Sequence, residues 1–226
     1  MKFTYYGQSC FAIEVAGKKL LFDPFISGNP LAKDIDINRI EADYILVSHG
    51  HGDHVADLVA IAKRTGAMVI AAYEVVNWAM KQGVEKGHHM NFGPFGFDFG
   101  TVRFVPAAHS SSMPDGSNGG VAGGFVITTT EGNFYFAGDT SLMLDMQLIP
   151  KYYAQLNFAI LPVGGNFTMN VNDALIAADF IECDKIIGVH FDTFDPIKID
   201  HDAAKEIFSG AGKELTLPKI GDVIEL

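Results

Sequence analysis

Three histidines and one aspartate lie within positions 49–54, which read His-Gly-His-Gly-Asp-His. Neutral imidazole nitrogen and carboxylate oxygen are the donors that borderline divalent ions such as zinc prefer. The two glycines leave the backbone free to turn tightly. A single ion would need three of the four side chains. Two ions could divide them, with the first two histidines on one ion and the Asp-His pair on the other. We favour the divided arrangement over a set of solvated loop histidines, because surface turns rarely concentrate imidazole in this way. The candidate ligands are His49, His51, Asp53 and His54.

Three further candidate donors each follow an apolar segment that predicts a strand. Apolar runs at 102–108, 134–138 and 186–189 lead into these donors, just as the run 43–48 leads into the hexad. Ligands bind in open α/β architectures at the carboxyl ends of strands. We therefore expect the four strand ends to converge on one cleft. The three donors are His109, Asp139 and His190.

Hydrophobic periodicity predicts strands that alternate with helices along the chain. Short strands joined by tight turns are expected in the stretch 88–104, which is rich in glycine and phenylalanine. Other strands are predicted at 3–6, 11–15, 19–22, 44–47, 67–71, 123–129, 133–137, 158–161 and 185–189, before a closing strand pair. Helices are predicted at 55–64, 74–82, 142–153, 173–182 and 201–208.

This alternation predicts an α/β fold in which two sheets pack face to face with helices outside, a four-layer α/β/β/α sandwich. The chain has 226 residues, 48% of them hydrophobic, which suffices for one large core. No linker, repeat or low-complexity tract divides it. We expect residues 1–226 to form a single domain.

Composition excludes several classes of partner. The formal net charge of −11 repels polyanions, so nucleic acid is not an expected partner. No apolar run approaches the roughly 20 residues that cross a bilayer, and the first residues read as a strand without the features of a signal peptide. We expect a cytoplasmic protein that acts on a small molecule and does not bind membranes. Cys10 and Cys183 fit a reducing compartment as small buried apolar residues.

The seven donors, in this order and context, resemble the signature of the metallo-β-lactamase superfamily: an H-x-H-x-D-H turn, then a distant His, an Asp and a His at strand ends. The resemblance spans almost the whole chain. Within the superfamily, the segments 6–11, 21–24 and 166–169 are similar to those of small metal-dependent hydrolases related to L-ascorbate-6-phosphate lactonase.

The resemblance implies a role for each donor. His49, His51 and His109 would bind a first ion, while Asp53, His54 and His190 would bind a second. Asp139 would bridge both ions. The ions would lower the pKa of a bridging water to about 7, and the resulting hydroxide would attack a carbonyl or phosphoryl centre. Asp53 would also orient this nucleophile, as the catalytic residue.

Three functional hypotheses stay open from the sequence. The complete donor series favours a binuclear hydrolase acting on a small ester, lactone or phosphorylated metabolite. The alternatives are a non-hydrolytic metal-binding or redox di-iron module and a metal-dependent nuclease or phosphodiesterase. Redox relatives in the superfamily commonly carry Glu where this chain has His51, so His51 favours hydrolysis. Two zinc ions are expected, although such sites also accept Mn, Ni or Fe.

Residues near the donors support weaker predictions. Ser110, Ser111, Asn166 and Thr168 are candidate substrate contacts, and Ser112 adjoins the first two. Many relatives have Asp where this chain has Gly165, which leaves the duty of that position open. Asp192 and Thr193 either orient a ligand histidine or cap a turn, and Asp23 either supports the site or ends its strand. The aromatic residues Phe92, Phe95, Phe97 and Phe99 could cover a second subunit as readily as the core. His88, His89 and His201 are expected not to bind metal.

Overall fold

The first sheet combines the N-terminal meander with parallel strands. In the computed structural model, which describes all 226 residues, this seven-stranded sheet has the order β14-β1-β2-β3-β4-β5-β6. β14, β1, β2 and β3 pair antiparallel, and β3 to β6 pair parallel. The strands are β1 (Lys2–Gly7), β2 (Cys10–Val15), β3 (Lys18–Phe22), β4 (Tyr44–Val47), β5 (Met68–Ala72), β6 (Gly87–Met90) and β14 (Val223–Glu225).

The second sheet repeats this layout with the order β13-β12-β11-β10-β9-β8-β7. β7 to β10 pair antiparallel, and β10 to β13 pair parallel. The strands are β7 (Pro94–Phe97), β8 (Gly100–Pro106), β9 (Gly123–Thr129), β10 (Gly132–Phe136), β11 (Phe158–Pro162), β12 (Lys185–Val189) and β13 (Glu214–Thr216). The predicted short strands between 88 and 104 are confirmed.

The two sheets pack face to face around an aromatic layer. Phe11 and Phe22 stack with ring centroids 4.5 Å apart, and Phe136 of the opposite sheet meets Phe11 edge-on at 5.0 Å. All three side chains are fully buried. Because the inward faces of both sheets contribute large apolar side chains, this layer fixes how one sheet lies on the other.

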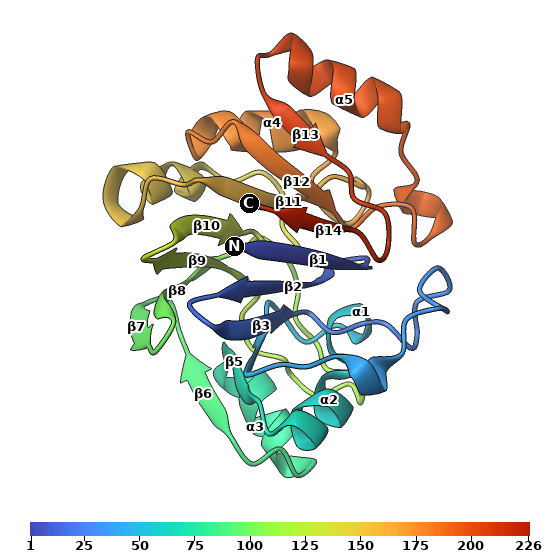
Figure 1. The fold of residues 1–226 in the computed structure, drawn as a ribbon, viewed down its shortest axis with the longest axis vertical. Coiled ribbons are helices and arrows are strands. Elements are labelled where there is room, and N and C mark those ends of the chain that lie inside the picture. Colours follow the sequence, from blue (N-terminus) through green and yellow to red (C-terminus); the bar gives the residue numbers. More distant parts are fainter.

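Helices cover the outer face of each sheet (Figure 1). α2 and α3 lie on the first sheet, and α4 and α5 lie on the second. The side chain of Asn170 caps α4 by accepting from the backbone N–H groups of Asn172 and Asp173. The predicted four-layer sandwich is therefore confirmed. The helices are α1 (Gly52–Val55), α2 (Leu58–Thr65), α3 (Tyr73–Lys81), α4 (Val171–Phe180) and α5 (His201–Gly210).

Two predicted helices were wrong, and the two predicted closing strands exist but join different sheets. The helix expected at 142–153 is a 3₁₀-helix, Leu144–Gln147, followed by a π-helical turn, Ile149–Tyr153, and Pro150 removes a backbone donor there. The single helix expected at 55–64 is interrupted at Asp57, whose carboxylate instead accepts backbone N–H groups from Ile26 and Ser27. The closing strands do not pair with each other, because β13 joins β12 while β14 joins β1 in the other sheet.

Short 3₁₀-helices at Ile37–Arg39 and Asp195–Ile197 were not predicted. Both cysteines are free and buried, as expected. None of the helices combines the length and apolar character that crossing a bilayer would require.

Candidate metal centre

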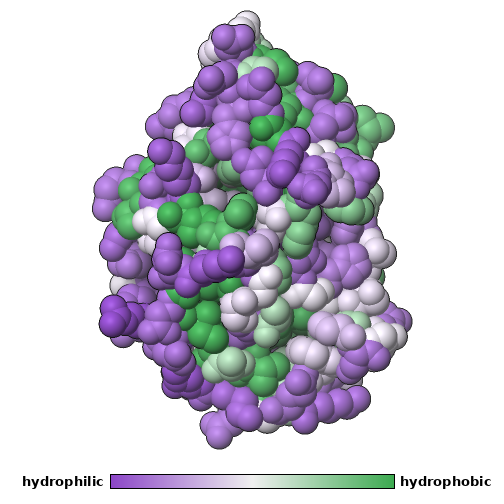
Figure 2. Space-filling model, turned by 90° about the vertical axis from the view of Figure 1, so that its right-hand side faces the viewer, coloured by the Kyte–Doolittle hydropathy of each residue, from purple (hydrophilic) through white to green (hydrophobic).

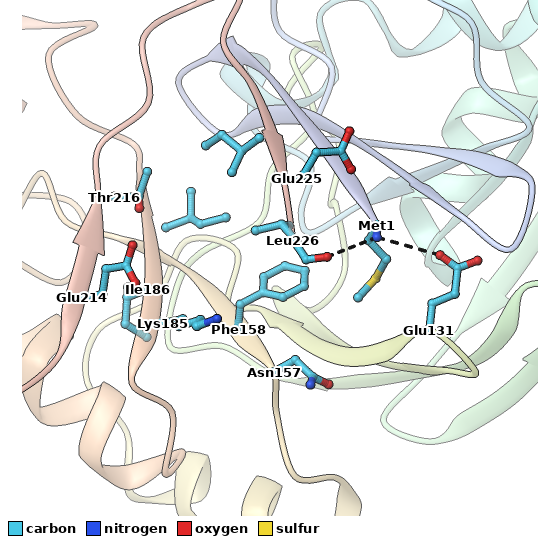
Figure 3. Close-up of a pocket in the computed structure, with 12 residues that line it drawn as sticks. Met1, Glu131, Asn157, Phe158, Lys185, Ile186, Glu214, Thr216, Glu225 and Leu226 are labelled. Atoms are coloured by element: carbon cyan, nitrogen blue, oxygen red, sulfur yellow. Dashed lines mark hydrogen bonds and ion pairs between the residues drawn. The ribbon is translucent and has the colours of Figure 1, made fainter.

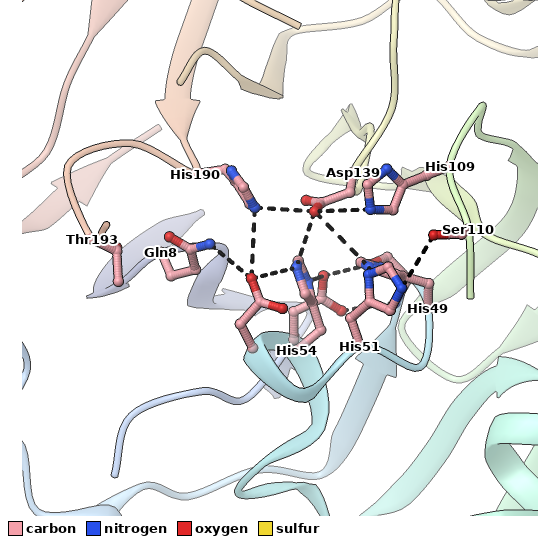
Figure 4. Close-up of polar contacts among 12 residues, drawn as sticks. Gln8, His49, His51, His54, His109, Ser110, Asp139, His190 and Thr193 are labelled. Atoms are coloured by element: carbon pink, nitrogen blue, oxygen red, sulfur yellow. Dashed lines mark hydrogen bonds and ion pairs between the residues drawn. The ribbon is translucent and has the colours of Figure 1, made fainter. Parts of the chain in front are cut away.

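The seven candidate ligands lie in the segments that follow four strands, five of them in loops and two on a short helix. His49 and His51 follow β4, and α1 begins directly after them and carries Asp53 and His54. The other three donors follow β8, β10 and β12. The structure brings all seven side chains together, and Figure 4 shows the histidines of this set and Asp139 turned toward one another.

The first group consists of His49, His51 and His109. One ring nitrogen from each lies within 4.8 Å of the others. His49 Nε2 is 2.9 Å from His51 Nδ1, and the His109 ring centroid is 5.0 Å from that of His49. Three imidazole nitrogens that point at one another in this way match the nitrogen donors of a zinc-type ion.

The second group consists of Asp53, His54, Asp139 and His190, again with one donor atom each within 4.8 Å. Asp139 Oδ2 is 3.0 Å from His190 Nε2 and 3.3 Å from His54 Nε2. Asp53 Oδ2 is 3.5 Å from His54 Nε2 and 3.7 Å from His190 Nε2. This group offers two carboxylates and two imidazoles around one point.

One oxygen of Asp139 faces both groups. The same Oδ2 atom lies 3.6 Å from His109 Nε2 and 3.9 Å from His49 Nε2. The backbone before it turns at Gly138, with φ of 63°. A Cβ atom at Gly138 would lie 2.7 Å from the Gly123 carbonyl oxygen and 2.7 Å from Ser48 Cβ. Only glycine fits this close approach, which places Asp139 between the two groups.

Divalent ions fit these donors. His54 Nε2 and Asp139 Oδ1 are buried without a hydrogen-bond partner, which is rare for polar atoms of a folded protein. His54 Nε2 lies 3.3 Å from the other oxygen of the same carboxylate, Asp139 Oδ2, which is itself a candidate ligand atom. A bound cation would give both unpaired atoms a partner, and it would explain why the lone pairs of the neighbouring side chains converge.

Electrostatics at the second group also favour a cation. Burial lowers the pKa of His54, but the carboxylates of Asp139, Asp53 and Asp23 outweigh burial and raise it well above its usual value. His190 behaves likewise, and its pKa rises to about 9. By contrast, burial holds the pKa of His49 well below its usual value. The carboxylates of the second group thus favour positive charge at that point, which a bound cation would supply in place of the imidazole protons.

Asp23 supports the site, which decides between its two predicted roles. Its Oδ2 atom lies 2.7 Å from His54 Nδ1 and accepts the Ser48 hydroxyl at 2.6 Å. Its Oδ1 atom accepts the Ser48 backbone N–H at 2.7 Å. The Ser48 hydroxyl is also 2.9 Å from His49 Nδ1. One buried carboxylate therefore orients an imidazole in each group, a common arrangement behind metal-binding histidines.

Gln8 is a supporting residue that the sequence analysis missed. Its side-chain amide donates to Asp53 Oδ2 at 2.9 Å. Its backbone carbonyl accepts from the His190 backbone N–H at 2.9 Å and from the Tyr5 hydroxyl at 2.9 Å. Gln8 adopts a positive φ of 54° in the turn between β1 and β2. A motif search cannot find it, because its partners are distant in sequence.

A cavity of about 610 Å³ opens over both groups. Of the predicted substrate contacts, Ser110 lines this cavity, with its hydroxyl 3.3 Å from His51 Nε2. Ser111 does not line it and accepts the Gly50 backbone N–H at 3.1 Å. Asn166 and Thr168 do not line it either, and the Thr168 hydroxyl faces the Met169 carbonyl at 3.4 Å. Two unpredicted residues, Phe167 and Phe194, complete the wall.

The remaining histidines lie outside the seven-residue cluster. His88 packs on Phe95, with ring centroids 4.1 Å apart. His89 contacts the Asn77 side-chain oxygen at 3.1 Å. His201 Nε2 is 2.6 Å from Asp192 Oδ2. Asp192 therefore holds the following turn rather than the His190 ring.

A second cavity, of about 270 Å³, lies away from this cluster (Figure 3). Its lining includes Met1, whose amino group donates to the Leu226 backbone oxygen at 3.2 Å and lies 3.9 Å from a Glu131 carboxylate oxygen. Lys185 also lines this cavity, and no histidine does. The cavity therefore lacks the donor chemistry of the first one.

Comparison with known proteins places this geometry in context. Residues 18–191 match the family model described as a beta-lactamase superfamily domain. The chain is 53% identical over 228 residues to a Christiangramia forsetii protein named UPF0173 metal-dependent hydrolase, with 100% of each chain covered. It is 54% identical over 227 residues to the protein of the same name from Flavobacterium johnsoniae, again with 100% of each covered. It also superposes on Igni18, a metallo hydrolase from the archaeon Ignicoccus hospitalis. The TM-score is 0.88 at 32% identity, covering 99% of this chain and 97% of that one.

Proposed function

This chain belongs to the beta-lactamase superfamily, and from that premise we propose that it is a metal-dependent hydrolase that works with two divalent ions. One observation carries the proposal: two clusters of metal-binding side chains share one carboxylate oxygen, Asp139 Oδ2, under an open cavity. A structural histidine cluster would not need its donor atoms to point inward or to remain unpaired.

The donors divide between the ions as the sequence resemblance implied. His49, His51 and His109 would hold the first ion. Asp53, His54 and His190 would hold the second, with Asp139 shared. When bound, the ions supply a nucleophile by lowering the pKa of water to about 7, and they polarise the bond under attack. Zinc suits this imidazole-rich set best, and Mn, Ni or Fe also bind such donors.

The chain itself contributes orientation. Asp53 lines the cavity while Gln8 fixes its Oδ2 atom, so this carboxylate can orient the attacking water. Ser110 lies on the same wall and can donate a hydrogen bond to the substrate. The substrate is a small ester, lactone or phosphorylated metabolite, since the cavity of about 610 Å³ is of small-molecule size.

Hydrolysis fits this donor set better than redox chemistry does. The fold alone does not distinguish hydrolysis from redox chemistry, because the chain also superposes on CmlA, a diiron beta-hydroxylase, with a TM-score of 0.77 at 13% identity. In this chain imidazoles outnumber carboxylates among the donors, and His51 occupies the position where redox relatives commonly have Glu. Carboxylates suit iron better than a further imidazole does. The net charge of −11 also disfavours a nuclease.

The test combines metal content with a substrate screen. Purified protein is loaded with zinc or manganese and assayed against lactones, phosphodiesters and thioesters, with His51→Ala as the disabled variant. His89→Ala is the matched control, because His89 lies outside the cluster and contacts only surface groups. We expect chelation and His51→Ala to abolish turnover and His89→Ala to preserve it. Activity that survives both chelator and His51→Ala would overturn the proposal.

A further inference from the structure

Two exposed phenylalanines form the apolar part of the cavity above the seven-residue cluster. Phe167 keeps 54% and Phe194 keeps 37% of its surface exposed, although both are large apolar side chains. Both line the same cavity as five of the seven candidate ligands, which are His51, Asp53, His109, Asp139 and His190. Figure 2 views the side of the molecule on which the loops after β3 and β12 lie, and shows apolar surface among hydrophilic groups. Apolar side chains exposed beside a polar centre are typical of a ligand-binding wall.

Phe167 is held by a short turn that is anchored beside Asp139. The turn contains two positive φ angles, 72° at Gly165 and 57° at Asn166. Gly165 and Met169 close it with a backbone hydrogen bond of 3.0 Å. The Met169 side chain is fully buried, and its N–H donates at 2.9 Å to the carbonyl of Thr140, the residue after Asp139. The backbone that carries Phe167 is therefore fixed relative to the shared carboxylate.

Phe194 is held equally firmly beside His190. Asp192 closes the loop that carries it, by donating its backbone N–H to the Ile197 carbonyl at 2.9 Å and by accepting the Ile199 N–H at 3.1 Å. The Phe194 ring also lies 6.4 Å from the ring of Phe25, which is only 7% exposed. The backbone that carries each phenylalanine is therefore already in place before a ligand binds, which reduces the entropy lost on ordering the loops.

The cavity offers no cationic side chain to an anionic group of the substrate that lies away from the metal-binding residues. The lining residues include no Lys and no Arg. Apart from the candidate ligands and the two phenylalanines, they are Gly52 and Ser110. A phosphate remote from the reacting bond would therefore meet no cationic side chain there, and Ser110 would be the one neutral hydroxyl side chain in reach. Phosphate recognition in proteins usually relies on Arg, Lys or several backbone N–H groups.

From these placements we propose that Phe167 and Phe194 bind the non-reacting part of a neutral substrate, so that the enzyme prefers esters or lactones bearing an alkyl or aryl group over phosphorylated metabolites. The inference rests on the proposed function, because it assigns the substrate class of the same centre. The reacting carbonyl would lie over the donors, and the apolar group would lie against the two rings.

Straight-chain alkyl hydroxamates test this without requiring turnover. Their hydroxamate head chelates an open metal centre, and the length of the tail is varied from acetohydroxamate to octanohydroxamate. Binding to the zinc-loaded protein is measured by titration calorimetry. We expect the affinity of the hydroxamate to rise about fourfold with each methylene group added to a short tail. This factor corresponds to about 0.8 kcal/mol per buried methylene. Succinic monohydroxamate, whose tail ends in a carboxylate, should bind more weakly than butanohydroxamate, which has the same number of carbon atoms and an uncharged tail.

Substituting the two phenylalanines tests where the hydroxamate tail binds. The double variant Phe167→Ala/Phe194→Ala should bind acetohydroxamate like the unmodified protein and lose the dependence on tail length. Phe95→Ala is the matched control, because Phe95 is 48% exposed and packs on His88, away from the cavity lining. Metal content of each variant verifies that the centre is intact.

The outcomes separate the two proposals. Binding of acetohydroxamate with no gain from a longer tail, or tighter binding of the anionic tail, would overturn this inference and leave the hydrolase proposal standing. Tail dependence that survives the double substitution would overturn the assignment to Phe167 and Phe194. Failure of the metal-loaded protein to bind any hydroxamate would contradict the open metal centre, and the substrate inference with it.

Discussion

Replacing Asp23 by asparagine isolates the hydrogen bond that fixes an imidazole of the candidate metal centre. The Asp23 side chain is fully buried and faces three donors: the Ser48 N–H, the Ser48 hydroxyl and His54 Nδ1. A carboxylate accepts all three, which keeps the His54 proton on Nδ1 and leaves the Nε2 lone pair free for a metal. An amide has the same shape but only one acceptor oxygen. One or more of the donors must then face the amide NH₂ group.

The size of the effect of Asp23→Asn depends on which group loses its hydrogen-bond acceptor. If the amide nitrogen faces Ser48 N–H, a buried donor goes unsatisfied at a cost of about 1–3 kcal/mol. If it faces His54, the imidazole proton moves to Nε2, where it competes with the metal. Changes behind a metal-binding histidine typically lower metal affinity by about 10- to 100-fold, or about 1.4–2.8 kcal/mol. We expect Asp23→Asn to lower zinc affinity by a factor in this range.

Competition with a chromophoric chelator measures this affinity, and Asp57→Asn is the matched control. Asp57 is also a buried carboxylate, only 3% exposed, and it accepts the Ile26 N–H at 2.6 Å and the Ser27 N–H at 2.9 Å. It makes no hydrogen bond to a histidine in the cluster. Both variants should unfold at lower urea concentration, but only Asp23→Asn should weaken zinc binding. Equal zinc affinity for Asp23→Asn and the unmodified protein would refute the reasoning, as would an equal loss in the control.

Three further predictions test the surroundings of the site. Gly138→Ala should lower the free energy of unfolding by about 1–3 kcal/mol in urea titrations, since its Cβ would clash with the Gly123 carbonyl; an unchanged midpoint would contradict this. Asp139→Ala should reduce bound zinc from two ions to one or none by elemental analysis, and two retained ions would exclude a shared ligand. Burial raises the pKa of the Cys10 thiol, which stays protonated as pH rises through its usual value. Iodoacetamide should therefore label Cys10 at pH 8.5 only in denaturant, and rapid labelling of the native chain would be inconsistent with this burial.

The layers of the fold were predictable because their signals are local. Strands such as β4 and β12 are continuous apolar runs, which buried parallel strands require. Candidate ligands could be named from local signals too, since four of them crowd into one hexad after β4 and the other three follow predicted strands. Their assignment to metals remains a prediction, although the structure brings all seven together.

Features that depend on distant contacts were not predictable. The roles of Asp23 and Gln8 arise from partners on other strands, which no periodicity reports. The partners of β13 and β14 depend on which sheet each reaches after α5. Phe167 lines the cavity while its polar neighbours Asn166 and Thr168 do not, and the turn that carries them contains two successive positive φ angles, which no hydrophobic pattern reports.

Anomalous scattering from a crystal grown with zinc tests the central claim most directly. The account predicts two peaks, one within about 2.0–2.2 Å of a ring nitrogen of His49, His51 and His109, and one within that distance of donor atoms of Asp53, His54 and His190. Asp139 should lie between the two peaks. Zinc found elsewhere on the protein, with none of these seven side chains coordinating it, would contradict the account.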